Sequence, residues 1–273
     1  AALFALSLHF MMGPGGMYSF GHAAYFGLGA YGAALLFKNA GLSMGWALGL
    51  GPLVAGLGAV VFGWFCVRLS GVYLAMLTLA FAQIVWSIVY QWDAFTGGSN
   101  GVIGIWPSDF FSGTRYYFFV LILVVVSAWL MRRILYSPFG YAMRAARDSV
   151  LRAHALGMNV MRIQWLAFVI AGLFAGLAGA LFVFAKGSTS PEVLSISRSV
   201  DGLVMVLLGG VQYLAGPIAG AGAFQLLQDY FTGLTTYWHA LFGLVILLLV
   251  LVFPAGLAGG ADRLRTHWLV RKR

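Results

Sequence analysis

The residues of this chain that could do chemistry are few, and one group has the spacing of a hydrolase nucleophile. Gly97, Gly98, Ser99, Asn100 and Gly101 fit the pattern G-x-S-x-G, in which a serine stands on a sharp turn between a strand and a helix. No positioned histidine or acid is visible around this serine. With Thr96 before it, the segment is also rich in turn-forming residues. It is therefore interpreted as a gate or docking loop, as a structural turn, or as a hydrolase elbow that lacks its context.

The remaining polar groups are scattered. Ser19 and His22 lie at the start of an apolar run, where His22 either lines a pathway or caps a broken helix. Thr78 and Gln83 are the uncharged polar residues of another run, and they fit a weakly polar pathway or hydrogen bonds between helices. The histidines have no metal-ligand spacing, so we expect no metal site.

No phosphate-binding loop of the form G-x-x-x-x-G-K-[ST] occurs, so nucleotide chemistry is expected on another chain. A stand-alone channel or secondary transporter would place charged residues within its membrane spans. The only acids in the apolar runs are Asp201 and Asp229, near helix ends. An intramembrane enzyme would need a nucleophile with its base, and none converges here.

Composition predicts what must position these residues. The 273 residues are 62% hydrophobic and 8% charged, with long apolar runs and no period-2 alternation, which indicates membrane-spanning helices. Gly/Pro breaks occur at 13–16, at 209–210 and at 216–217. The prediction is one all-α polytopic membrane domain over 1–273, with about eight to nine transmembrane helices, some broken or short. The chain starts at Ala1 inside an apolar run, so we expect its first helix to be incomplete.

The two broken segments, 13–22 and 209–217, are expected to approach each other, or an interface with a second membrane subunit, near the membrane centre. Non-helical backbone at membrane depth must be shielded from lipid. Gly216 belongs to this expected pathway.

The residues behind the net charge of +9 are distributed according to the expected membrane topology. Twelve of the 16 Lys and Arg residues fall on one side if 132–163 is cytoplasmic, which also places the C-terminus in the cytoplasm. They are Arg68, Arg132, Arg133, Arg144, Arg147, Arg152, Arg162, Arg263, Arg265, Arg271, Lys272 and Arg273. This distribution argues against nucleic-acid binding.

The long polar interruption 136–163 predicts a cytoplasmic helix over 138–156, with Ser137 as its N-cap, Pro138 in its first turn and Gly157 at its end. An apolar stripe runs through Met143, Ala146, Val150 and Ala153. Arg144, Asp148 and Arg152 are spaced to pair with one another. The small, Ala-rich stripe favours docking on a protein, and an interfacial helix on anionic lipid is the alternative.

Small residues recur every four positions in two runs: Gly51, Ala55, Ala59 and Gly63, and Gly172, Gly176 and Ala180. They predict close helix packing within the bundle, or a dimerisation seam.

The polar segment 136–163 resembles the coupling loop of ATP-binding-cassette importer permeases. The similarity is closest to the branched-chain amino acid family of the LivM type. The similarity lies in Gly140, Arg144, Ala145, Arg147, Asp148, Ala155, Leu156, Gly157, Met158 and Asn159. It extends over 19–31, 70–83, 96–101, 190–192, 208–210, 216–217 and 253–257, nearly the whole chain in the family's order.

The resemblance implies an inner-membrane permease subunit that moves branched-chain or related small amino acids inward by alternating access; urea or small amides are an alternative cargo. It implies a second permease, two cytoplasmic ATP-binding subunits and an extracytoplasmic binding protein. ATP and magnesium would bind the partners, and this chain would hold no cofactor and no catalytic residue. The residues implied in ATPase coupling are Gly140, Arg144, Ala145, Arg147, Asp148, Arg152, Ala155 and Gly157.

Overall fold

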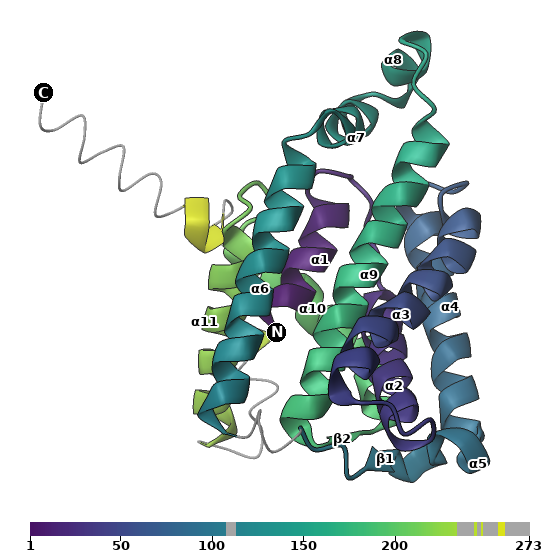
Figure 1. Cartoon of the computed structure of the whole chain (residues 1–273). Coiled ribbons are helices and arrows are strands. Elements are labelled where there is room, and N and C mark those ends of the chain that lie inside the picture. Colours follow the sequence, from purple (N-terminus) through teal and green to yellow (C-terminus); the bar gives the residue numbers. More distant parts are fainter. Residues whose placement is uncertain (108–112, 234–242, 245–246, 248–255, 260–273) are drawn as a thin grey trace, which may run out of the picture.

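The computed structural model describes residues 1–107, 113–233, 243–244, 247 and 256–259. They form a bundle of helices (Figure 1). The helices are α1 (Ala2–Met12), α2 (His22–Lys38), α3 (Met44–Cys66), α4 (Gly71–Gln91), α5 (Asp93–Thr96), α6 (Thr114–Leu135), α7 (Pro138–Asp148), α8 (Val150–Ala155), α9 (Val160–Lys186), α10 (Ile196–Gly209) and α11 (Gly216–Thr232), with 3-10 helices η1 (Gly98–Asn100) and η3 (Pro191–Leu194).

In the described part of the chain, four helices, α3, α4, α6 and α9, are long and apolar enough to cross a membrane. The chain is therefore a helical membrane protein, as expected. Its described residues also contain a small β element that the sequence did not predict. Strands β1 (Val102–Ile103) and β2 (Ser188–Thr189) pair antiparallel, with Val102 opposite Thr189. The apolar run 236–253 lies largely outside the described residues.

The core of the bundle is the contact of α3 and α9 with α2, where small residues let the backbones meet. A Cβ added at Gly172 or Gly176 of α9 would collide with the Cβ atom of Ala59 or Ala55 of α3. A Cβ at Gly29 of α2 would collide with the backbone of Gly176. The four-residue pattern thus packs helices inside this chain.

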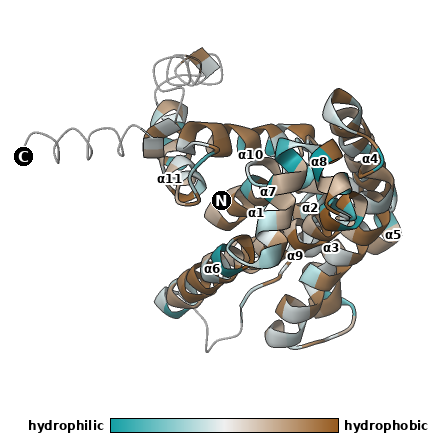
Figure 2. Cartoon of the chain, turned by 90° about the horizontal axis from the view of Figure 1, so that it is seen from above, coloured by the Kyte–Doolittle hydropathy of each residue, from teal (hydrophilic) through white to brown (hydrophobic). Residues whose placement is uncertain are grey.

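Helix α6 lies at one edge of the bundle, as the view from above shows (Figure 2). Only 17% of its apolar window is buried. Its outward side chains include Tyr117, Ile122 and Val125, each more than half exposed. In a membrane this face is suited to contact lipid or another membrane chain, because its exposed groups are apolar.

Helices α7 and α8 stand at one end of the bundle, and α5, β1 and β2 at the other (Figure 1). The basic residues divide in the same way. Arg132 and Arg133 end α6 and Arg162 begins α9 at the α7–α8 end, and Arg68 lines a cavity together with His154 of α8. At the opposite end Lys38 donates to the Ile103 carbonyl (3.4 Å) and Lys186 ends α9. Seven of the twelve basic residues expected to share one side are described, and they lie at the α7–α8 end; the five of the C-terminal tail lie outside the described residues.

Both predicted helix breaks are confirmed. Residues 13–21 separate α1 from α2, and residues 210–215 separate α10 from α11. The apolar run 17–37 becomes helical only at His22; residues 17–21 are non-helical, with Met17 and Ser19 buried and Tyr18 and Phe20 exposed.

The single helix expected over 138–156 is wrong. Ser149 is extended, with φ −163° and ψ 106°, and divides it into α7 and α8. The cause is local: the Ser149 hydroxyl accepts a hydrogen bond from the Arg152 N–H (3.3 Å) and starts a second helix. The kink takes Val150 off the apolar stripe and leaves it 49% exposed, whereas Met143, Ala146 and Ala153 are buried as predicted.

Two side-chain expectations in this loop are also wrong. Ser137 stands at the N-cap position of α7 as predicted, but its hydroxyl makes no capping hydrogen bond and donates back to the Ile134 carbonyl (2.6 Å). Asp148 pairs with its neighbour Arg147 (2.8 Å) and not with Arg144 or Arg152. Arg144 instead donates to the Leu135 carbonyl (3.0 Å) and stacks on the Tyr141 ring, because the end of α6 leaves unpaired carbonyls within its reach. The position of Pro138 in the first turn and the positive φ of Gly157 are as predicted.

Candidate functional site

Buried hydroxyl and imidazole groups surround the first helix break. His22, the first residue of α2, lies 2.8 Å through Nε2 from the Ser7 hydroxyl of α1. That hydroxyl donates its own proton to the Phe4 carbonyl (2.7 Å), so it accepts from His22, which must carry its proton on Nε2. Both residues are fully buried. His22 therefore holds the start of α2 against the middle of α1.

The first turn of α2 and the non-helical segment before it are bonded to two further helices. The Phe20 N–H donates to the Thr78 hydroxyl of α4 (3.2 Å), and the Ala23 N–H donates to the Ser199 hydroxyl of α10 (3.0 Å). A Cβ at Gly21 would collide with the Thr78 carbonyl. Side chains from other helices thus satisfy the free N–H groups at the start of α2, as buried non-helical backbone requires.

The structure brings three predicted residues, Ser19, His22 and Thr78, to this break. Ser19 is fully buried, and its hydroxyl has no hydrogen-bond partner among the described residues. Gln83 lies further along α4, half-buried, and forms no hydrogen bond to a described residue. Sequence reasoning missed Ser7 and Ser199. Ser7 is a hydroxyl within an otherwise apolar run, whereas Ser199 lies in the polar stretch 195–201 and nothing local distinguishes it from its neighbours.

At the second break the ends of α10 and α11 are in close contact, and they also contact the end of α1. A Cβ at Gly216 would lie 2.5 Å from the Gly210 carbonyl oxygen and 2.7 Å from that of Gly209, so the two helix ends meet without side chains between them. His9 of α1 lies 2.8 Å through Nε2 from the Val211 carbonyl. The expected approach of the two breaks is therefore confirmed.

The loop that contains Thr96–Gly101 lies at the end opposite α7. The buried Thr96 hydroxyl bonds to the Val89 and Trp92 carbonyls (2.6 and 2.8 Å), so it serves the turn itself. Gly97, Gly98 and Gly101 all have positive φ, which glycine adopts without strain. Ser99 and Asn100 are exposed on η1. In the described part of the chain, Ser99 has no hydrogen bond to a histidine, so no triad supports the hydrolase interpretation.

The loop formed by α7 and α8 has one face toward the bundle and one toward its surroundings. Gly140 packs tightly on the Leu135 backbone, while Met143, Ala146 and Ala153 face inward. The outer face combines two apolar side chains, Leu151 and Leu156, which are 82% and 75% exposed. Beside them is a shallow cavity of about 260 Å³. It is lined by Ala145, Asp148, Ser149, Arg152, Ala153 and Leu156.

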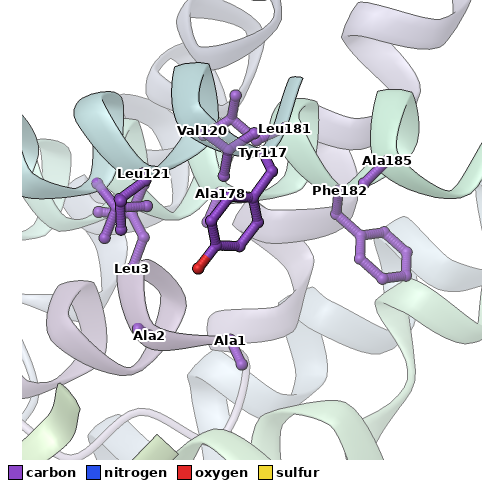
Figure 3. A pocket seen from close by; sticks show the side chains of 11 residues that line it. Ala1, Ala2, Leu3, Tyr117, Val120, Leu121, Ala178, Leu181, Phe182 and Ala185 are labelled. Carbon is purple, nitrogen blue, oxygen red and sulfur yellow. The ribbon is translucent and has the colours of Figure 1, made fainter. Parts of the chain in front are cut away.

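Two of the larger cavities bear on the question of where a ligand could bind. One of about 410 Å³ lies at the α7–α8 end, between the α3–α4 connection, α8 and the start of α9. Another, of about 350 Å³, lies between α1, α6 and α9. Figure 3 shows the Tyr117 hydroxyl directed into this second cavity, whose other lining side chains are apolar. The second cavity therefore offers no charged side chain to a ligand.

The fold and the site define a helical membrane protein with two interrupted helices joined inside its bundle and a basic helical loop at one end. Residues 1–253 match the family model described as the permease component of the branched-chain amino acid transport system. The chain belongs to this family of ATP-binding-cassette importer permeases, so it is a transport subunit.

Three relatives show the range of the similarity. The high-affinity branched-chain amino acid transport system permease protein LivM of Escherichia coli is 30% identical, over 93% of this chain and 67% of the relative. LivH of Escherichia coli is 26% identical, over 94% of this chain and 91% of the relative. The autoinducer 2 import system permease protein LsrC of Photorhabdus laumondii is 30% identical over 50% of this chain and 43% of the relative. No solved structure matches the chain.

Proposed function

We propose that this permease moves branched-chain or related small amino acids inward across the bacterial inner membrane, by alternating access driven from the α7–α8 loop. The observation that carries the coupling part is the outer face of α8, where exposed leucines lie beside Arg152 at the basic end of the molecule. The cargo follows from the names of the relatives LivM and LivH.

In this proposal the α7–α8 end faces the cytoplasm and the Ser99 loop faces outside. One-sided arginines support that orientation, since cytoplasmic ends are enriched in positive charge. The C-terminus is then cytoplasmic. The domain 1–273 then has about eight to nine membrane helices. This number includes the four long helices, the shorter α1, α2, α10 and α11, and the apolar run 236–253.

The partners in this proposal are a second related permease, two cytoplasmic ATPases that bind ATP and magnesium, and an extracytoplasmic binding protein that delivers the substrate. Membrane lipid covers the remaining apolar surface. The permease itself carries no catalytic group. Its work is to convert displacement of the α7–α8 loop into rearrangement of the helices that meet at the two breaks.

The outer face of α8 is suited to a protein groove. Leu151 and Leu156 would each gain on burial in a partner, by about 1.5–3 kcal/mol. Arg152 adds a cation that an acidic partner side chain could pair with. Helix α7 supports this face from behind, because its buried residues fix it to α6 and α9.

The test is to express the chain with its partner subunits and to measure co-purification of the ATPase. We expect Leu151→Asp to weaken the association by at least about tenfold, since burial of a leucine is lost and a charge must be desolvated. Ile103→Asp, at a residue of similar character that is 66% exposed at the opposite end, is the control and should leave association intact. Unchanged co-purification of the Leu151→Asp complex would refute the assignment of this face.

A further inference from the structure

Arg147 of α7 reaches into the first helix break. Its Nη1 atom donates to the Gly13 carbonyl (2.8 Å), although the two residues are 134 positions apart in the chain. Its Nε and Nη2 atoms donate to Asp148 Oδ1 (2.9 and 2.8 Å). Each nitrogen of the guanidinium thus has a partner within the chain. Arg147 was expected to contact the ATPase, but one of its three hydrogen bonds is made to the Gly13 carbonyl of the bundle.

The Gly13 carbonyl is a natural acceptor for this cation. Gly13 ends α1 and its own N–H bonds to the His9 carbonyl (2.8 Å). The last carbonyls of a helix have no partner within it and carry partial negative charge. The aliphatic part of the Arg147 side chain is also in close contact with this break: a Cβ at Gly16 would lie 2.5 Å from Cγ of Arg147. Gly16 has φ +66°, which also favours glycine.

The same helix end is bonded to the second break. His9, one turn before Gly13, is 2% exposed and lies through Nε2 2.8 Å from the Val211 carbonyl. A carbonyl only accepts, so His9 carries its proton on Nε2. A Cβ at Gly13 would stand 2.7 Å from the same Val211 oxygen. The end of α1 is therefore held between α7 on one side and the α10–α11 break on the other.

The contact places the first part of this break. Gly16 lies against Arg147 of α7, and Gly13 lies between Arg147 and the second break. The depth of the break in the membrane stays a prediction.

We propose that Arg147 and His9 form a relay: Arg147 transmits displacement of the α7–α8 loop to the end of α1, and His9 passes it to the α10–α11 break. Arg147 is in this view a positioning residue and not an ATPase contact. The inference rests on the proposed function, because the relay has a role only where an ATPase moves the loop. The relay assigns residues to the transmission of movement from the α7–α8 loop to the two helix breaks.

The physical reason is the nature of the three connected segments. Each is an interruption or an end of helix, where the backbone is not fixed by its own ladder and can adopt a second arrangement. Coupling between distant sites needs such two-state elements joined by contacts. Hydrogen bonds that involve a charged donor are stronger than neutral ones, so Arg147 links the segments firmly.

The experiment uses the assembled transporter in proteoliposomes and measures ATP hydrolysis and substrate uptake on the same sample. We expect Arg147→Met to retain association and ATP hydrolysis while uptake falls by at least about tenfold, within the usual range of coupling between sites. Arg147→Lys, which keeps a cation near Gly13, should restore part of the uptake. Arg162→Met, which removes an arginine at the same end whose side chain has no hydrogen bond to a described residue, should transport normally.

The His9 variants test the second bond. His9→Leu should reduce the uptake obtained per ATP hydrolysed, and His9→Gln, which retains an N–H donor, should reduce it less. Because both residues act in one series, the double variant Arg147→Met/His9→Leu should be no worse than the more severe single variant. Multiplied losses would mean that the two contacts act separately and would overturn the relay.

The remaining outcomes separate this inference from the proposed function. Wild-type uptake per ATP in Arg147→Met would overturn the relay. Loss of ATPase association in Arg147→Met, as expected for Leu151→Asp, would identify Arg147 as an ATPase contact and would overturn it too. Normal association of Leu151→Asp would instead contradict the docking face, whatever Arg147 does.

Discussion

Replacement of Gly21 by alanine should displace the non-helical segment 17–21 that precedes α2. Gly21 has φ −105° and ψ 15°, which alanine tolerates, so the backbone angles add no strain. The obstacle is the Thr78 carbonyl, with which the new Cβ would collide; the Ala82 Cβ atom would lie only 3.2 Å away. A helix carbonyl cannot rotate away as a side chain can. The segment itself must move.

The size of the effect follows from two contributions. Overpacking of this kind costs about 1–3 kcal/mol. Movement of the segment also breaks the bond from the Phe20 N–H to the Thr78 hydroxyl, with a loss of about 1 kcal/mol. The sum, about 2–4 kcal/mol, shifts the equilibrium between seated and displaced segment by roughly thirtyfold to several hundredfold.

The assay combines thermal unfolding in detergent with uptake in proteoliposomes. Gly21→Ala should lower both the unfolding temperature and the uptake. The matched control is Gly49→Ala in α3, where a Cβ meets nothing within 4 Å. That variant should be neutral or slightly stabilising, because alanine favours helix over glycine by up to about 1 kcal/mol. If Gly21→Ala unfolds and transports like the wild type, the close approach to α4 is not a constraint on this protein.

Two further outcomes follow from the helix ends and from the proposed topology. Gly216→Leu should abolish uptake while the protein still inserts, since no side chain fits between Gly216 and the carbonyl of Gly209; normal uptake would show that the second break can open to admit one. Ser99→Cys, in a Cys66→Ala background that removes the chain's single cysteine, should react with an impermeant thiol reagent added outside intact cells. Reaction only from the cytoplasmic side would reverse the orientation of every helix.

The sequence predicted the elements whose signals are local. The Gly/Pro breaks, the small-residue repeats of α3 and α9 and the proline in the first turn of α7 are all read from nearby residues, because each acts through the backbone of its own segment. Even the approach of the two breaks could be inferred, from the need to shield non-helical backbone.

The unpredicted features depend on contacts between distant residues or on competition within a turn. Arg147 finds an acceptor 134 positions away, and nothing in the spacing of α7 indicates it. Ser7 and Ser199 become partners of α2 only when three helices pack together. At Ser149 a capping bond competed with helix continuation and prevailed, and a periodic pattern that crosses it does not reveal the outcome.

The short β pair has a consequence for how the bundle can move. It ties the loop after η1 to the end of α9, and the Gly104 and Ile105 N–H groups add bonds to the Gly187 carbonyl (3.1 and 3.0 Å). Helix α9 has 27 residues and is about 40 Å long. With its far end anchored in this way, a shift of about 2 Å at its α8 end tilts it by roughly 3°. Helices α2 and α3 pack closely on α9 through glycines, so they tilt together with α9 as one body. The β pair is then the pivot point of that motion.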